Sequence, residues 1–186
     1  MSQTLVPGSL GAIATGAGQT LAEAFINADA IVVVDVSGSM GANDARGGQS
    51  RYTVACTELA RLQQRMPGKV AVVAFSGAVE FCPSGVPLYM GGSTDLAKAL
   101  RFVRPADGTV RFVVVSDGQP NDPDKALEVA RRFSSAIDVI YVGPPDGGGE
   151  LFLAELARAS GGTYVVAERA HELAATVQAM LTGGTA

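Results

Sequence analysis

The chain has 186 residues, of which 47% are hydrophobic, and its formal net charge is −4. This length favours a single domain with a sizeable core, and the hydrophobic content is that of a globular protein rather than a disordered one. No apolar run approaches the ~20 residues of a membrane span, and because no basic patch is present we expect no nucleic-acid partner.

The N-terminal segment, residues 1–18, is rich in glycine and contains no basic residue. It lacks the charged start of a signal peptide, and we interpret it as a flexible arm that precedes a single domain over residues 19–186. The two cysteines, Cys56 and Cys82, cannot form a disulfide framework. We expect both to be free thiols in a reducing compartment, which favours a cytoplasmic location.

The first elements of the domain are a short helix over residues 20–27 and a strand that starts at the β-branched run of residues 31–34. Such a run suits a strand buried on both faces of a sheet. The strand ends at Asp35, and Ser37 and Ser39 follow within a glycine-containing loop. In an extended chain, residues spaced i, i+2 and i+4 point their side chains toward the same face of the strand. Converging oxygen ligands of this kind indicate a hard cation such as Mg²⁺.

A helix and a hairpin are expected next. Ser50 is a suitable N-cap for a helix over residues 51–65. Residues 69–75 then read as a second buried strand, and a two-residue turn joins it to a short alternating strand over residues 78–82. Strands joined by two residues must be antiparallel, so this hairpin is expected at one edge of the sheet.

The second half of the chain repeats the pattern of buried strands and amphipathic helices. A loop ending in Ser93-Thr94-Asp95 opens a helix, and a third buried strand over residues 110–116 ends directly before Asp117. Asp122 then caps a helix that has proline at its first position. The remaining expected elements are strands over 137–142 and 163–166 and helices over 150–160 and 170–181.

Strands that alternate with helices predict an α/β fold, in which a mainly parallel sheet lies between two layers of helices. Ligands bind such sheets where the strands end. If the strands of Asp35 and Asp117 are neighbours, both carboxylates and the hydroxyl of Thr94 meet at one sheet edge. Hydroxyl ligands add no negative charge, so a metal held mainly by them stays electrophilic if the aspartates act through water. An Asp or Glu carboxylate from a partner protein can then complete its coordination.

Together, Asp35-x-Ser37-x-Ser39, Thr94 and Asp117 resemble the metal-ion-dependent adhesion site of von Willebrand factor type A domains. The resemblance covers roughly residues 28–182, and all five motif positions are filled. It implies a Rossmann-like, doubly wound sheet of six strands with one antiparallel edge strand. It also implies Mg²⁺, replaceable by Mn²⁺ or Ca²⁺, with the three hydroxyls as direct ligands and the two aspartates acting through water.

Five further residues form a candidate partner-binding rim around this site: Asp44, Arg46, Ser93, Asp95 and Asp122. Four of them have a simpler interpretation as well. Asp44 and Arg46, which lie on the loop after the first strand, are also explained as solvated loop charges. Asp95 and Asp122 also suit the start of a helix, where a carboxylate interacts favourably with the helix dipole.

The function expected from these features is that of a non-enzymatic, metal-dependent protein-binding module, of the intracellular bacterial type that acts in a multiprotein complex. One alternative is a Mg²⁺-dependent phosphatase, although Ser37 stands where that chemistry wants a second aspartate. Another is a serine hydrolase, for which the only histidine, His171, stands far from Ser37 in the sequence. A third, which the resemblance implies, is an accessory subunit of an ATP-driven complex. Since this chain has no nucleotide motif of its own, the ATPase would be a separate protein.

Overall fold

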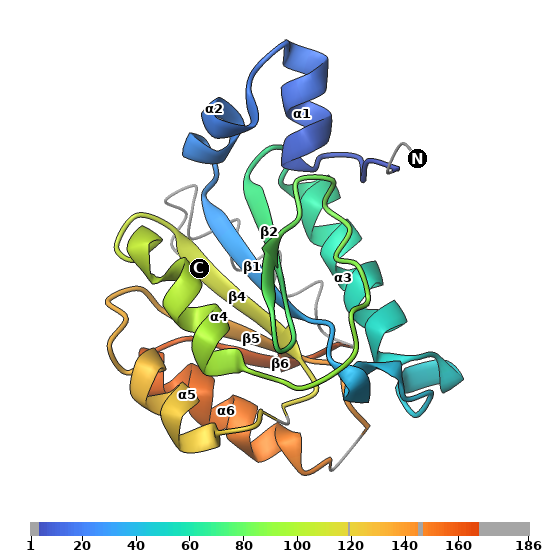
Figure 1. Cartoon of the computed structure of the whole chain (residues 1–186), viewed down its shortest axis with the longest axis vertical. Helices are drawn as coiled ribbons and strands as arrows, with labels where there is room; N and C mark the ends of the chain where they lie inside the picture. The colour runs from blue at the N-terminus through green and yellow to red at the C-terminus, as the bar shows by residue number, and fades with distance from the viewer. Residues whose placement is uncertain (1–3, 119, 145–146, 168–186) are drawn as a thin grey trace.

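A computed structural model describes residues 4–118, 120–144 and 147–167, and its centre is a six-stranded sheet in the order β3-β2-β1-β4-β5-β6 (Figure 1). The strands are β1 (Ala30–Asp35), β2 (Val70–Phe75), β3 (Val79–Phe81), β4 (Arg111–Ser116), β5 (Ile137–Tyr141) and β6 (Tyr164–Val166). All neighbouring strands are parallel except β2 and β3. The predicted α/β fold and its antiparallel edge hairpin are therefore confirmed.

Helices cover both faces of the sheet. One face packs on α3 (Arg51–Arg65), and the other packs on α4 (Leu96–Val103), α5 (Pro123–Ala130) and α6 (Gly149–Ser160). The central strand β1 is buried along its whole length, because it has a strand on each side and helices above and below. This burial explains why its sequence is a continuous β-branched run rather than an alternating pattern.

Each of the principal helices α3, α4 and α5 begins at the residue that capping chemistry indicates. The hydroxyl of Ser50 accepts from the N–H of Thr53 at 3.1 Å, which caps α3. Asp95 and Asp122 cap α4 and α5 in the same way, at 2.9 and 3.0 Å from the third residue of each helix. Both aspartates therefore do what their position at a helix start predicts.

The N-terminal segment differs from the predicted flexible arm, because residues 10–17 form a packed helix. This helix, α1 (Leu10–Ala17), is followed by α2 (Leu21–Ile26), and Leu10 is only 2% exposed. The N–H of Gly11 donates to the carbonyl of Pro83 at 2.8 Å, and a Cβ added at Gly11 would lie 2.7 Å from that oxygen. Small residues here allow close packing, whereas in the sequence they suggested flexibility.

The predicted closing helix over residues 170–181 and its His171 lie outside the described residues. Cys56 is half-buried and Cys82 buried, and both are free thiols. Among the helices described, none combines the length and the apolar character that crossing a bilayer requires.

Candidate metal centre

The carboxylate of Asp35 is fully buried at the last position of β1 and is held by two hydrogen bonds. Its Oδ1 accepts from the N–H of Ser37 at 2.9 Å, and its Oδ2 accepts from the hydroxyl of Ser116 at 2.7 Å. Ser116 lies next to Asp35 because β1 and β4 pair in parallel register. Burial raises the pKa of Asp35 from 3.8 to about 6, and the hydrogen bonds from Ser37 and Ser116 act in the opposite direction.

The hydroxyls of Ser37 and Ser39 lie 3.3 Å apart in the loop that follows β1. This loop contains a short 3₁₀ turn, η1 (Gly38–Gly41), which brings the two side chains to the same side. The N–H of Gly38 donates to the carbonyl of Gly92 at 3.0 Å. A Cβ at Gly38 would lie 3.3 Å from that oxygen, so the approach of the two loops is tight.

Thr94 is joined to the loop after β4 by a reciprocal pair of hydrogen bonds with Asn121. The N–H of Thr94 donates to Asn121 Oδ1 at 3.0 Å, and the N–H of Asn121 donates to the Thr94 carbonyl at 2.8 Å. Thr94 is 6% exposed. The neighbouring hydroxyl of Ser93 instead faces the β2–β3 turn, where a Cβ at Gly77 would lie 2.8 Å from it. The three loops are thus tied to one another at the carboxyl ends of β1 and β4.

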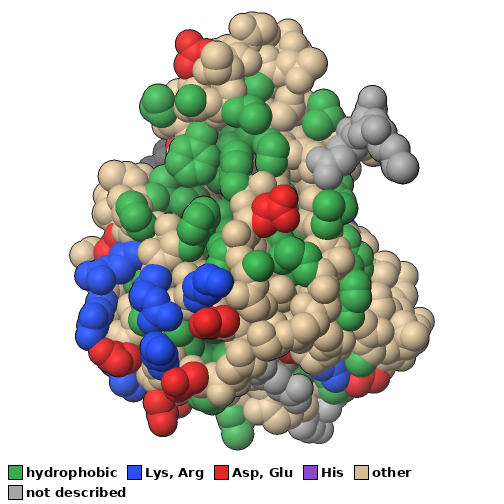
Figure 2. Space-filling view, in the orientation of Figure 1, with side chains coloured by type: hydrophobic (Ala, Val, Ile, Leu, Met, Phe, Trp, Pro, Cys, Tyr) green, Lys and Arg blue, Asp and Glu red, His purple; other side chains and the backbone are tan. Residues whose placement is uncertain are grey.

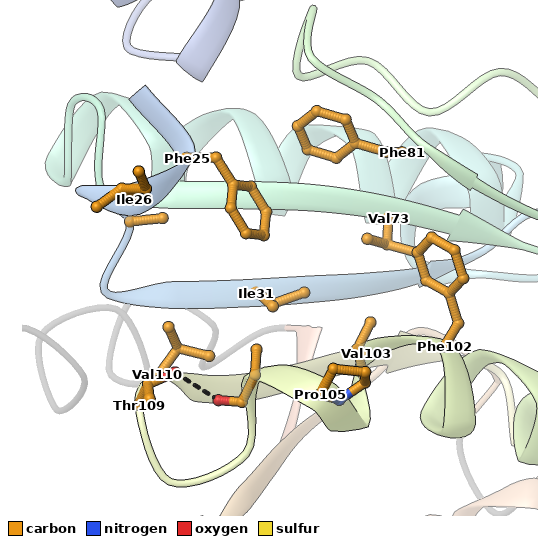
Figure 3. A pocket seen from close by; sticks show the side chains of 12 residues that line it. Phe25, Ile26, Ile31, Val73, Phe81, Phe102, Val103, Pro105, Thr109 and Val110 are labelled. Atoms are coloured by element: carbon orange, nitrogen blue, oxygen red, sulfur yellow. Dashed lines mark hydrogen bonds between the residues drawn. The ribbon is translucent and has the colours of Figure 1, made fainter. Parts of the chain in front are cut away.

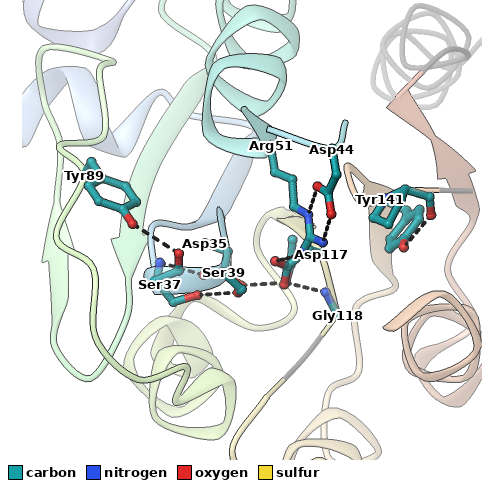
Figure 4. Close-up of polar contacts among 12 residues, drawn as sticks. Asp35, Ser37, Ser39, Asp44, Arg51, Tyr89, Asp117, Gly118 and Tyr141 are labelled. Atoms are coloured by element: carbon teal, nitrogen blue, oxygen red, sulfur yellow. Dashed lines mark hydrogen bonds and ion pairs between the residues drawn. The ribbon is translucent and has the colours of Figure 1, made fainter. Parts of the chain in front are cut away.

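Asp117 is buried beside this cluster and is paired with Arg51 from the first turn of α3 (Figure 4). Its Oδ2 accepts from Arg51 at 2.7 Å, and the same guanidinium donates to both oxygens of Asp44 at 2.8 and 2.7 Å. The hydrogen bonds from Arg51 lower the pKa of Asp44. The second oxygen of Asp117, Oδ1, is buried and has no hydrogen-bond partner among the residues that the structure describes.

The donor set fits a hard divalent cation. The residues described contain no group of three or more His, Cys, Asp or Glu side chains placed to hold a metal. What they contain at this edge is two buried carboxylates and three hydroxyls, all of them oxygen donors of the kind that Mg²⁺ prefers. A buried carboxylate oxygen without a partner is costly unless a cation or water satisfies it, so the Oδ1 of Asp117 supports a site for such a group.

The structure gives three of the five rim residues a local side-chain role. Asp44 is exposed and binds Arg51, whereas Asp95 and Asp122 cap α4 and α5. Ser93 is exposed, and Arg46 opens the 3₁₀ turn η2 (Arg46–Gly48). Their contact with a partner stays a prediction.

Three residues of the centre were not found by sequence reasoning: Arg51, Ser116 and Asn121. A sequence feature could have pointed to Arg51, because a cation in the first turn of a helix is unfavourable toward the helix dipole and needs another reason to be there. Ser116 and Asn121 act through hydrogen bonds between loops that are distant in the sequence, and nothing local marks them.

The geometry does not present Asp35 as the nucleophile of a phosphatase. Its side chain is fully buried, and both of its oxygens already accept hydrogen bonds. A nucleophilic carboxylate needs an oxygen that substrate can reach. Asp35 is placed instead to orient the loop that follows it.

No protein-family model and no curated protein matches the chain, but solved structures do. An aerotolerance-related membrane protein from Bacteroides fragilis matches with a TM-score of 0.65 and 19% identity, covering 81% of this chain and 96% of that one. The vWF domain of the type V pili tip protein Mfa5 from Porphyromonas gingivalis matches with a TM-score of 0.62 and 12% identity, over 86% and 97% of the two chains. Manganese-loaded Plasmodium vivax TRAP protein matches at 0.57 and 17%, over 80% and 72%. Likeness at these identities establishes the fold, and the chain has a von Willebrand factor type A-like fold.

Proposed function

We propose that the chain is a Mg²⁺-dependent protein-interaction module whose metal lies at the carboxyl ends of β1 and β4. The observation that carries this proposal is that three loops bearing hydroxyl or acidic side chains are hydrogen-bonded to one another at the carboxyl ends of β1 and β4. Beside them, among the described residues, a buried carboxylate oxygen of Asp117 has no partner. The fold supports it, since one of the matching structures is a manganese-loaded protein.

In this proposal Ser37, Ser39 and Thr94 bind the ion directly, and Asp35 and Asp117 bind it through water. The ion supplies an electrophilic centre, because hydroxyl ligands leave its positive charge largely uncompensated. A partner Asp or Glu carboxylate completes the coordination. The chain's own residues hold the site in shape: Ser116 fixes Asp35, and Arg51 fixes Asp117.

Metal binding is tested by calorimetry with Mg²⁺ and Mn²⁺ on the wild type, Asp35→Ala and Ser39→Ala. Glu128→Ala and Ser134→Ala are the matched controls, since both residues are exposed and lie in or beyond the second half of α5, away from Asp122. We expect the site variants to bind metal at least about tenfold more weakly, a loss of roughly 1.4 kcal/mol or more, while the controls match the wild type. Unchanged affinity in both site variants would contradict the assignment, provided circular dichroism shows that they are folded.

Partner binding is tested by pull-down from the source lysate in Mg²⁺ and in EDTA, with the wild type and Asp35→Ala as baits. A partner recovered only by the wild type in Mg²⁺ supports the proposal. A partner retained in EDTA assigns binding to another surface. The same preparations are assayed on generic phosphatase substrates, where turnover that Asp35→Asn abolishes would instead make the chain an enzyme.

A further inference from the structure

An apolar groove lies on the α4 face of the sheet, at the end away from the metal centre (Figure 3). Its volume is about 550 Å³. Ile31 and Val73 form the floor, Phe25 and Ile26 of α2 form one wall, and Phe102 of α4 belongs to the other. The groove also reaches the residues that precede β1 and β4, so it lies at the amino ends of the strands whose carboxyl ends form the metal centre.

Large apolar side chains on both walls are exposed to solvent. Ile26 is 80% exposed, Phe102 53% and Phe25 38%, and Phe25 packs edge-to-face on Phe81 with ring centroids 5.6 Å apart. Figure 2 shows the hydrophobic side chains gathered into one patch on this face. Single exposed apolar residues are ordinary, but a contiguous hollow patch of this kind marks a binding surface.

Exposed cations border the groove along α4. Of the acidic residues next to its lining in the chain, Asp29 pairs with Lys69, Asp107 accepts from the N–H groups of Ser134 and Ser135, and Glu80 is exposed. No charged side chain lines it, yet Lys98, Arg101 and Arg104 are exposed along α4 and the 3₁₀ turn η3 (Arg104–Ala106), beside Phe102. Lys98 Nζ donates to the carbonyl of Gly77 at 2.9 Å. Within the part of the chain that the structure describes, Arg101 and Arg104 form no ion pair. Figure 2 shows basic side chains next to the hydrophobic patch.

We propose that this groove docks an acidic amphipathic segment of a partner protein. The segment places its apolar side chains between α2 and α4, and its Asp or Glu side chains pair with Arg101 and Arg104. Because the cations lie outside the cavity, only an occupant that extends over α4 reaches them and the apolar floor together. A helix laid into a groove meets both requirements. A small polar ligand does not, since the lining offers no charged group to orient it.

This surface is distinct from the proposed metal-dependent one. Ile31 and Asp35 are four positions apart on β1, which is roughly 13 Å along the strand, and the groove opens toward the amino end. A segment bound in the groove therefore leaves the metal centre free. Binding here is expected to be independent of Mg²⁺, whereas binding at the metal centre is not.

The test uses fluorescein-labelled peptides of about 14 residues, roughly 21 Å as a helix. The probe peptide has Leu and Phe on one helical face and Glu on the other. A second peptide replaces every Glu by Lys, and a third replaces every Leu and Phe by Ser. Fluorescence anisotropy with the whole chain measures each affinity, in Mg²⁺ and in EDTA and at several salt concentrations.

We expect saturable binding of the acidic amphipathic peptide alone, with the same affinity in Mg²⁺ and in EDTA and with weaker binding as salt rises. Phe102→Ser and the double variant Arg101→Glu/Arg104→Glu are each expected to weaken it at least tenfold. The matched controls, Leu151→Ser and Lys125→Glu, change exposed residues elsewhere and are expected to bind like the wild type.

Five results overturn the proposal. The first is the absence of saturable binding up to millimolar protein, and the second is equal binding of the Lys peptide or of the groove variants. A dimer in sedimentation equilibrium that Phe102→Ser dissociates would assign the groove to a second copy of the chain. Binding to phosphatidylcholine vesicles that the same variant abolishes would assign it to a lipid surface. If the peptide is released by EDTA, it binds at the metal centre and the groove is not its site.

Discussion

The buried carboxylate of Asp35 makes the stability of the folded protein depend on pH. Because the pKa of Asp35 is raised in the folded protein, its carboxyl group stays protonated to a higher pH there than in the unfolded chain. The folded state therefore loses stability as pH rises from 3.8 toward about 6, and the full cost is present above that range. A shift of this size corresponds to about 3 kcal/mol when no cation compensates the charge.

Asp35→Asn is therefore expected to stabilise the metal-free protein above about pH 7. The amide keeps the shape of the carboxylate, its oxygen still accepts from the N–H of Ser37, and its nitrogen can donate to the Ser116 hydroxyl. The gain should disappear below about pH 4, where Asp35 is protonated in both states. Urea denaturation in EDTA across this pH range measures it, with Asp124→Asn as the control. Equal effects at both ends of the range would show that charge is not the cause.

The second buried carboxylate, that of Asp117, differs from Asp35 because a cationic side chain of the same protein pairs with it. Asp117 is 2% exposed and pairs with Arg51, which is itself 8% exposed and clamped by both oxygens of Asp44. The guanidinium takes one oxygen of Asp117 and leaves Oδ1 unpaired. The pair thus compensates part of the buried charge and holds one oxygen ready for another ligand.

At the level of elements, α1 is an integral part of the fold. Leu10 and Ala14 belong to the hydrophobic core on the α4 side, and Ser9 caps the helix by accepting from the N–H of Ala12 at 3.2 Å. Gly8, at φ +84°, lies so close to α3 that a Cβ there would be 2.3 Å from the carbonyl of Gln63. The segment is therefore fixed by contacts that tolerate only small side chains.

Leu10→Ala is expected to destabilise the whole chain by about 2–4 kcal/mol, because it deletes a buried side chain and leaves a cavity. Leu151→Ala, at a side chain that is 82% exposed, is expected to change stability by less than about 0.5 kcal/mol. Urea denaturation of both variants measures the difference. An equally small effect of the two substitutions would show that residues 10–17 do behave as a loosely attached arm.

The elements that sequence reasoning found are those with strong periodicity and local boundary chemistry. The run ending at Asp35, the Ser50 cap of α3 and the Asp122-Pro123 start of α5 each carry their own indication of structure. The sequence left open whether the strands of Asp35 and Asp117 are neighbours, and the sheet order shows that β1 and β4 are adjacent. By contrast, α1 is set by packing against the residues after β3, and the roles of Arg51 and Asn121 arise from contacts between distant segments. Such contacts leave no local pattern.

On the scale of the whole molecule, the sheet separates two surfaces of different chemistry. Its carboxyl edge gathers buried acids and hydroxyls, and the amino end of its α4 face carries an apolar groove beside exposed cations. A protein that bridges partners benefits from such separation, because each surface can be occupied without displacing the occupant of the other. The proposed metal would bind only a site that the folded chain assembles, so its binding would stabilise the entire fold.

Mg²⁺ is therefore expected to stabilise the whole chain, by about 2.7 kcal/mol at a concentration one hundred times its Kd. The gain should be larger in Arg51→Gln. Without the guanidinium, the buried charge of Asp117 is uncompensated in the metal-free state, which costs about 3 kcal/mol, and the metal then restores part of that loss. Thermal unfolding in Mg²⁺ and in EDTA measures both shifts, with Arg132→Gln, which pairs with exposed Glu128, as the control. Equal Mg²⁺ shifts in Arg51→Gln and the wild type would mean that Arg51 and the metal do not share the charge of Asp117, and an absent shift in both would remove the metal from this edge of the sheet.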